Sequence, residues 1–147
     1  MSASEPALYV AEPPAAFTSR PPMVVDCSAL SAIVFDEPAR DEALARLIGR
    51  SLHAPNLLDH EIASVALKKH RTDGPAEALA QALRDYATFD IELHPVDPVA
   101  QYELAARYEL TAYDAAYLWL AAELKAPLAT FDRRLAEAAQ AHLGGLS

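Results

Sequence analysis

The sequence predicts an α/β fold: a three-layer α/β/α sandwich with a central, mainly parallel sheet. Two observations support this prediction. Short apolar runs alternate along the chain with longer stretches in which apolar residues recur at helical spacing. The 147 residues, 52% of them hydrophobic, suffice for the core of one domain. Parallel strands need crossover connections, which are usually helical, so the alternation places helices on both faces of one sheet.

The chain is predicted to consist of a proline-rich lead segment and one domain. Five of the 11 prolines lie within residues 1–22, a composition typical of a flexible tail, and the domain is expected to span residues 23–147. Its first strand is a short apolar run, Met23 to Val25, that ends at Asp26. A helix follows, because its apolar residues share one face: Leu30, Ile33 and Val34.

The middle of the chain continues this alternation. Helices are expected at about 38–48, where Gly49 marks a stop, and at 60–71, where apolar residues follow the i, i+3, i+4, i+7 rule. Another helix opens after Asp73-Gly74-Pro75. A short strand and loop are expected within residues 51–58, and a strand at 91–94, where polar and apolar residues alternate.

The last third of the chain repeats the pattern. Asp97 and Pro98 predict an N-cap and the first residue of a helix that runs to Arg107. The next helix begins at Thr111, with Ala115, Leu118, Trp119 and Ala122 on its buried side. Residues 127–131 form a short apolar strand before Asp132, and a closing helix ends at Gly144-Gly145.

Charge and composition exclude several classes of protein. The net charge of −9 argues against a protein that coats nucleic acid with a broad basic face. Cys27 is the single cysteine, the five histidines are unclustered along the chain, and no Cys/His spacing fits a zinc site. The first 22 residues resemble neither a signal peptide nor a membrane span, so we expect a soluble, cytoplasmic protein.

Four separated acidic residues form the candidate site. Asp26 ends the first strand and Asp132 follows the last, where ligands bind in open α/β sheets. Glu61 and Asp114 lie in first turns of helices, where free N–H groups favour negative charge. Carboxylates that converge repel one another, and a hard divalent cation relieves that repulsion. Ligation by oxygen alone points to Mg²⁺ or Mn²⁺, with a bound water as nucleophile for a phosphodiester.

These acids lie in four segments that resemble the PIN-domain family, and most of all its VapC-type toxins. The segments are V-V-D-C-S-A-L (24–30), H-E-I-A-S-V (60–65), T-A-Y-D-A-A-Y-L-W-L-A (111–121) and L-A-T-F-D-R-R-L (128–135). The resemblance implies a metal-dependent endoribonuclease, commonly a homodimer, that is the toxin of a VapBC-type toxin–antitoxin system and is inhibited by a VapB-like antitoxin. It assigns metal binding and catalysis to four acids and a supporting role to two hydroxyls: Asp26, Glu61, Asp114 and Asp132, with Ser28 and Thr130.

Basic residues near the motifs are the candidates for holding the RNA substrate. Arg133 and Arg134 directly follow one of the four acids, and Lys68, Lys69 and Arg71 form a second basic group. The antitoxin is expected to place a basic side chain, an arginine, in the acidic cleft. The sequence leaves open which RNA is cleaved.

Each acid also has a simpler explanation, and two other functions remain open. Asp26 and Asp132 are favoured helix N-caps, Asp114 complements a helix dipole, and Asp59 competes with Glu61. Tyr113 and Tyr117 are interpreted as packing residues rather than platforms for bases. The alternatives are a metal-dependent DNA nuclease or phosphatase, and a PIN-like protein-interaction module that binds through the apolar helix faces around Leu118 and Leu79.

Overall fold

The structure, a computed structural model, describes residues 20–146. The predicted flexible tail therefore lies outside the described residues except for its last three. Of these, Pro22 already belongs to the first strand, and the carbonyl of Pro21 accepts a hydrogen bond from the backbone N–H of Ser51. A proline is tolerated at the first position of a strand, so the strand begins one residue earlier than the apolar run indicated.

Four parallel strands form the sheet, and their order across it is β3-β2-β1-β4. Their bounds are β1 (Pro22–Val25), β2 (Ser51–Pro55), β3 (Ile91–His94) and β4 (Leu128–Ala129). The register places Val25 beside Ala129 and Val24 beside His53. β4 is shorter than the predicted strand over residues 127–131, and the hydroxyl of Thr130, directly after it, donates to the Asp26 carboxylate.

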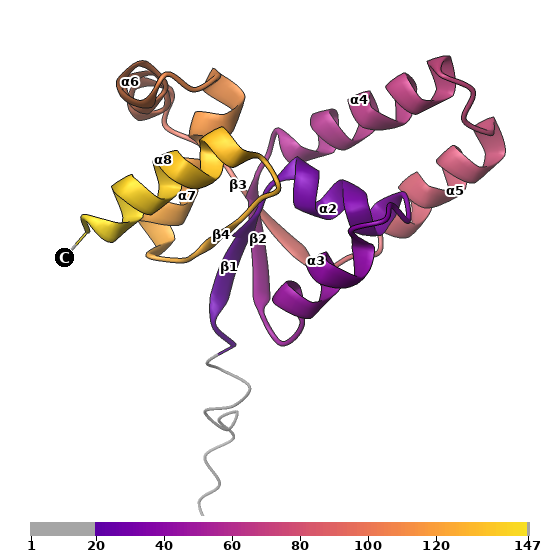
Figure 1. Cartoon of the computed structure of the whole chain (residues 1–147), viewed down its shortest axis with the longest axis horizontal. Helices are drawn as coiled ribbons and strands as arrows, with labels where there is room; N and C mark the ends of the chain where they lie inside the picture. The colour runs from indigo at the N-terminus through magenta and orange to yellow at the C-terminus, as the bar shows by residue number, and fades with distance from the viewer. Residues whose placement is uncertain (1–19, 147) are drawn as a thin grey trace, which may run out of the picture.

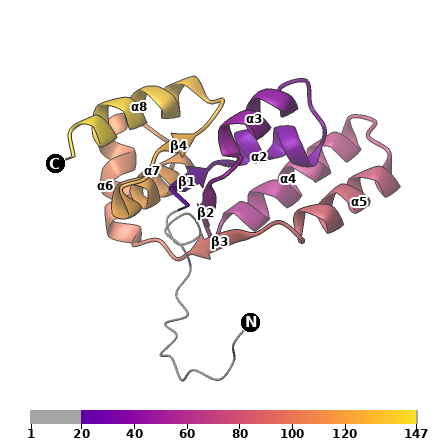
Figure 2. The same ribbon diagram turned by 90° about the horizontal axis from the view of Figure 1, so that it is seen from below.

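Helices cover both faces of the sheet, so the predicted three-layer α/β/α fold is confirmed (Figures 1 and 2). On one side lie α2 (Cys27–Val34), α3 (Arg40–Leu47), α4 (Leu58–Arg71) and α5 (Ala76–Tyr86). On the other side lie α6 (Pro98–Tyr108), α7 (Ala112–Leu124) and α8 (Arg133–Gly144). Within the described residues, no helix is both long and apolar enough to cross a membrane.

The core is centred on α7, which packs on β1 and β2. Its alanines let the helix approach the sheet closely, and Leu118 and Leu120 are fully buried beside Val24. Two residues that the sequence placed on the buried side, Trp119 and Ala122, are only half-buried. The inward face of α7 is therefore centred on residues 115–118 and 120–121.

The strand order creates one switch point, and it lies between β1 and β4. From β1 the chain moves outward through β2 to the edge strand β3, and then crosses back to form β4 on the other side of β1. The connections on the two sides of β1 diverge at this place, which leaves a crevice at the carboxyl ends of the strands. Asp26 and Asp132 follow β1 and β4 at this crevice.

Candidate active site

Asp26 is the most buried acid of the site, with 4% of its surface exposed. It is the N-cap of α2, and its Oδ1 accepts hydrogen bonds from the backbone N–H of Ala29 (2.9 Å) and from Ser28 Oγ (2.7 Å). Its Oδ2 accepts one from Thr130 Oγ1. The capping interpretation is therefore right, and it coexists with a place in the site, since each carboxylate oxygen has more than one lone pair.

The two hydroxyls that the sequence predicted as supports also fix the loop before α8. Ser28 Oγ accepts a hydrogen bond from the backbone N–H of Phe131 (2.8 Å), and Thr130 Oγ1 accepts one from that of Asp132 (2.9 Å). Asp132 is in turn the N-cap of α8, and its Oδ1 accepts from the backbone N–H of Leu135 (3.0 Å). This network ties the end of β4 to the start of α2.

Glu61 extends toward the same place from α4, and a tyrosine holds it there. The hydroxyl of Tyr117 donates to Glu61 Oε1 at 2.7 Å, while the ring is buried in the core with 1% of its surface exposed. Tyr117 was predicted as a packing residue only, and its contact with Glu61 was not predicted. A signal was present, because Tyr117 lies three residues after Asp114 and shares its helix face.

The rival of Glu61 lies elsewhere. Asp59 accepts a hydrogen bond from Tyr86 Oη at 2.6 Å and lines a different pocket, between α4, α5 and β3. Residues two apart on a helix are about 200° apart around its axis, so the two carboxylates of α4 face different surroundings. Geometry thus selects Glu61 over Asp59.

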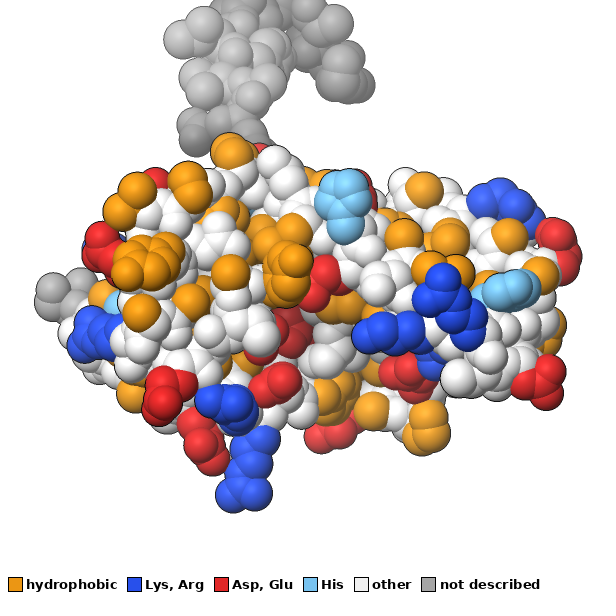
Figure 3. Space-filling view, turned by 90° about the horizontal axis from the view of Figure 1, so that it is seen from above, with side chains coloured by type: hydrophobic (Ala, Val, Ile, Leu, Met, Phe, Trp, Pro, Cys, Tyr) orange, Lys and Arg blue, Asp and Glu red, His pale blue; other side chains and the backbone are white. Residues whose placement is uncertain are grey.

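One pocket of about 810 Å³ has all four acids in its lining: Asp26, Glu61, Asp114 and Asp132. We call it the acidic pocket. Figure 3 looks onto the carboxyl ends of the strands, where acidic side chains gather in a central hollow. Asp114 reaches it from the first turn of α7, whose N-cap is Thr111. Segments more than 100 residues apart in sequence therefore lie together in this pocket. The acids come from the ends of two strands and the first turns of two helices, the positions that the sequence predicted for them.

Burial, and in second place the charge of neighbouring acids, raises the pKa of three acids of this pocket. Burial raises the pKa of Asp26, against the hydrogen bonds from Thr130, Ala29 and Ser28, and the charge of Asp132 raises it further. Burial also raises the pKa of Glu61, and its neighbouring acids oppose the effect of the Tyr117 hydrogen bond. For Asp114, burial and the charges of nearby carboxylates again raise the pKa.

No basic side chain neutralises this charge directly. Among the described residues, none of the ion pairs includes any of the four acids. Lys69 lines the pocket, but its ammonium binds Glu37 at 2.8 Å. Arg134 is close enough to Asp114 to oppose the rise in its pKa, and donates to the carbonyl of Glu109. Arg133 is 91% exposed and pairs with Glu137, outside the pocket.

This donor set fits a hard divalent cation. Carboxylate oxygens are the ligands that Mg²⁺ and Mn²⁺ prefer, and uncompensated carboxylates of raised pKa gain most from a bound cation. The pocket also contains Cys27, whose thiol has its pKa raised to about 11 by burial. The thiolate form is therefore disfavoured at neutral pH, and Cys27 adds neither a nucleophile nor a soft metal ligand.

The chain is similar in sequence and in structure to known proteins. The family model described as PIN domain matches residues 23–141. The chain is 36% identical to VapC ribonuclease Mb0985 of Mycobacterium bovis over 81% of this chain and 92% of that protein, and 34% identical to ribonuclease VapC1 of Mycobacterium tuberculosis over 78% and 89%. PAE2754 from Pyrobaculum aerophilum has a similar structure, with a TM-score of 0.66 over 85% of this chain and 88% of that one; at 22% identity the likeness is of fold alone.

Proposed function

This chain belongs to the PIN-domain family, among its VapC ribonucleases, and from this premise we propose that it is a metal-dependent endoribonuclease, the toxin of a VapBC-type toxin–antitoxin system. The observation that carries the proposal is the acidic pocket itself. Four carboxylates from four separate segments line it, and none of these four is in an ion pair among the described residues; a fifth acid of the lining, Glu37, is paired with Lys69. A site built in this way suits a cation-assisted reaction on a polyanion, because acids alone would repel RNA.

The cofactor we propose is Mg²⁺ or Mn²⁺, held by Asp26, Glu61, Asp114 and Asp132; once bound, it supplies an activated water and stabilises negative charge on the scissile phosphate. The chain's own contribution is positioning. Ser28 and Thr130 donate hydrogen bonds to Oδ1 and Oδ2 of Asp26, respectively, and so fix the orientation of its carboxylate. Tyr117 holds Glu61 in the same way from the core side of the pocket.

Basic residues at the margin of the pocket are proposed to position the RNA. Arg134 is close enough to Asp114 to affect its pKa, and Lys69 is part of the lining of the pocket. Arg133, at the start of α8, is paired with Glu137, and because both side chains are exposed it can exchange this pair for phosphates farther along the RNA. Such contacts steer the substrate to a protein whose net charge of −9 would otherwise repel it.

Two partners belong to this proposal. A VapB-like antitoxin is expected to inhibit the enzyme by placing an arginine in the acidic pocket, where a guanidinium pairs with carboxylates in bidentate fashion. A homodimer is expected from the family. Co-purification with the product of the adjacent small open reading frame tests the first, and the mass of the purified protein in solution tests the second.

The experiment that tests the activity compares matched acid variants. Purified protein freed of antitoxin should cleave RNA only when Mg²⁺ or Mn²⁺ is added. Asp26→Asn, Asp114→Asn and Glu61→Gln should each lower the rate at least about 100-fold, which corresponds to about 3 kcal/mol of transition-state stabilisation. Asp59→Asn, which changes an acid two residues from Glu61 but outside the pocket, should keep full activity. Metal-independent cleavage, or full activity of Asp26→Asn, contradicts the mechanism.

The other two functions are separated by binding and substrate competition. A protein-interaction module would bind neither Mg²⁺ nor Mn²⁺ in a calorimetric titration, whereas the enzyme binds them through the acidic pocket. One of the two apolar faces suggested for such a module is unavailable, since Leu118 is fully buried in the core, while Leu79 is half-buried. Competing single-stranded RNA, DNA and phosphate-ester substrates distinguish a ribonuclease from a DNA nuclease or phosphatase.

A further inference from the structure

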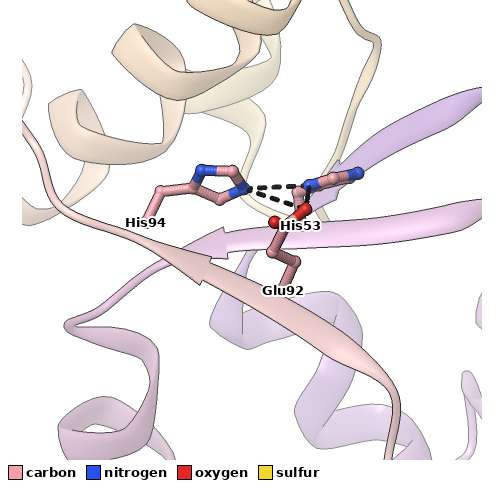
Figure 4. Close-up of side chains that lie close together, drawn as sticks. All are labelled: His53, Glu92 and His94. Carbon is pink, nitrogen blue, oxygen red and sulfur yellow. Dashed lines mark hydrogen bonds and ion pairs between the residues drawn. The ribbon is translucent and has the colours of Figure 1, made fainter.

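A second group of potential metal ligands lies on the sheet, outside the acidic pocket. It consists of His53 on β2 and Glu92 and His94 on β3, and none of the three lines the acidic pocket. The parallel register of β2 and β3 places His53 beside Glu92, and His94 two residues further along the same face. Figure 4 shows the three side chains pointing toward one another. The interpretation of the histidines as unclustered was therefore wrong for this pair.

The distances between the three side chains match a tetrahedral metal site. His53 Nδ1 lies 2.9 Å from His94 Nε2 and 3.2 Å from Glu92 Oε2, and His94 Nε2 lies 3.8 Å from the same oxygen. Ligands at about 2.0–2.1 Å from a tetrahedral ion are separated by about 3.3 Å, the edge of the tetrahedron. The three separations lie on both sides of this value and average close to it. Small side-chain adjustments therefore bring all three atoms to one ion.

Without a metal, one shared proton links the two imidazoles. A proton on His94 Nε2 donates to His53 Nδ1 across 2.9 Å, while the exposed Glu92 carboxylate is hydrated. A cation that replaces this proton is bound by the lone pairs of both nitrogens and of Glu92 Oε2, so metal binding displaces the proton and needs both rings neutral.

The surroundings of His53 also resemble those of a metal ligand. Its other ring nitrogen, Nε2, lies 3.0 Å from Ser51 Oγ. A ligating histidine commonly donates its second N–H to such a group, which fixes the tautomer and the orientation of the ring. Burial lowers the pKa of His53, so the neutral form that binds metals is favoured at neutral pH.

We propose that His53, Glu92 and His94 form a binding site for a divalent transition-metal ion, with Zn²⁺ as the best fit, that links the edge strand β3 to β2. Two imidazoles and one carboxylate favour Zn²⁺ over Mg²⁺, which prefers oxygen ligands alone. Glu92 is 67% exposed at its side chain, which leaves the fourth position accessible to water. This site differs from the acidic pocket in place and in ligand chemistry, and it does not depend on the ribonuclease activity.

Zinc binding to untagged, metal-free protein tests the proposal. Zn²⁺ is titrated against a chromophoric chelator in excess Mg²⁺, which occupies the acidic pocket, and Co²⁺ serves as a spectroscopic probe because tetrahedral Co²⁺ absorbs strongly in the visible range. One equivalent of tightly bound Zn²⁺ and a tetrahedral Co²⁺ spectrum are expected. Bound Zn²⁺ should also raise the thermal midpoint of the wild-type protein, since it joins two strands.

Variants locate the ion. Because His53 is buried and its loss threatens folding, the test uses the more exposed ligands, in the variants His94→Gln and Glu92→Gln. Each change should abolish tight binding of one equivalent of Zn²⁺ and the increase in the thermal midpoint, while circular dichroism shows an intact fold. The matched control is His70→Gln, an exposed histidine on α4, which should bind like wild type. Ser51→Ala should weaken Zn²⁺ by about tenfold or more, because it removes the partner of the ligating ring.

Two results overturn the proposal. One is a wild-type protein that binds no Zn²⁺ in excess Mg²⁺. The other is a folded His94→Gln protein that still binds one equivalent of Zn²⁺ with unchanged affinity and gives an unchanged Co²⁺ spectrum, which would place the ion elsewhere. Loss of binding in both ligand variants, with retention in His70→Gln, supports it.

Discussion

The replacement of Tyr117 by phenylalanine separates the packing role of this residue from its contact with Glu61. The ring is buried in the core and phenylalanine fills the same volume, so the change removes little more than the hydroxyl. That hydroxyl donates to the Glu61 carboxylate at 2.7 Å. We therefore expect Tyr117→Phe to fold normally but to hold Glu61 loosely.

The expected loss of stability follows from this one hydrogen bond. A bond to a charged acceptor contributes about 1.5–3 kcal/mol, and water replaces part of it here because Glu61 is half-buried. The free energy of unfolding should therefore fall by about 1.5 kcal/mol, the lower end of the range. For a domain of this size the thermal midpoint then falls by about 5 °C.

The functional effect is expected on metal affinity. Loss of a side chain that orients a metal ligand weakens binding by about 10–100-fold, so the Mn²⁺ concentration for half-maximal RNA cleavage should rise by that factor. Tyr86→Phe is the matched control, because it removes a hydroxyl that donates to Asp59 at 2.6 Å outside the acidic pocket. Thermal denaturation and Mn²⁺ titration of cleavage are measured on both. If the two variants show the same Mn²⁺ dependence, Tyr117 has no positioning role.

Two further changes test the electrostatics and the packing. Asp26, Glu61 and Asp114 have folded-state pKa values raised above those of the unfolded chain. These three carboxyls therefore stabilise the metal-free protein at low pH, and this stability is lost as pH rises through their raised pKa values. Between about pH 4, the ordinary carboxyl pKa, and pH 7, the thermal midpoint without metal should therefore drop less in Asp114→Asn than in wild type. Added Mn²⁺ should raise the wild-type midpoint more at pH 7 than at pH 4. Histidine titration is common to both proteins, and equal slopes of midpoint against pH would refute the reasoning. Gly74→Ala should lower the free energy of unfolding by about 1–3 kcal/mol in urea denaturation, since its Cβ would lie 2.7 Å from the carbonyl oxygen of Lys69. Gly144→Ala, whose Cβ meets nothing within 4 Å, is the control, and similar losses in both would exclude the steric cause.

Much of the fold was predictable because its signals are local. The strand Ile91–His94 and the cap at Asp97-Pro98 agree with the structure, since alternation and capping involve residues a few positions apart. Helix ends were predicted less well: α4 begins at Leu58, two residues before the expected start, because neither Leu57 nor its neighbours provide a side-chain cap that marks the boundary.

The candidate site was predictable in part for the same reason. Asp26 and Asp132 follow apolar runs, which is sufficient to place them at the carboxyl ends of strands. The choice between Asp59 and Glu61 depends on the direction in which α4 packs. That direction is determined by burial of Leu58, Ile62 and Ala66 against the rest of the core, and a single helical pattern does not show what lies opposite each polar residue.

By itself, then, the sequence determined the alternation of strands and helices, the caps, and the four acids as a set. Each of these features depends on residues that are close to one another along the chain. The tertiary structure decided which residues from distant parts of the chain contact one another. The hydrogen bond between Tyr117 and Glu61 joins α7 to α4, and the approach of His53 to His94 requires β2 and β3 to pair in one register. Strand order and register are set by packing of the whole core, so contacts between residues 41 or 56 positions apart leave no pattern in the sequence.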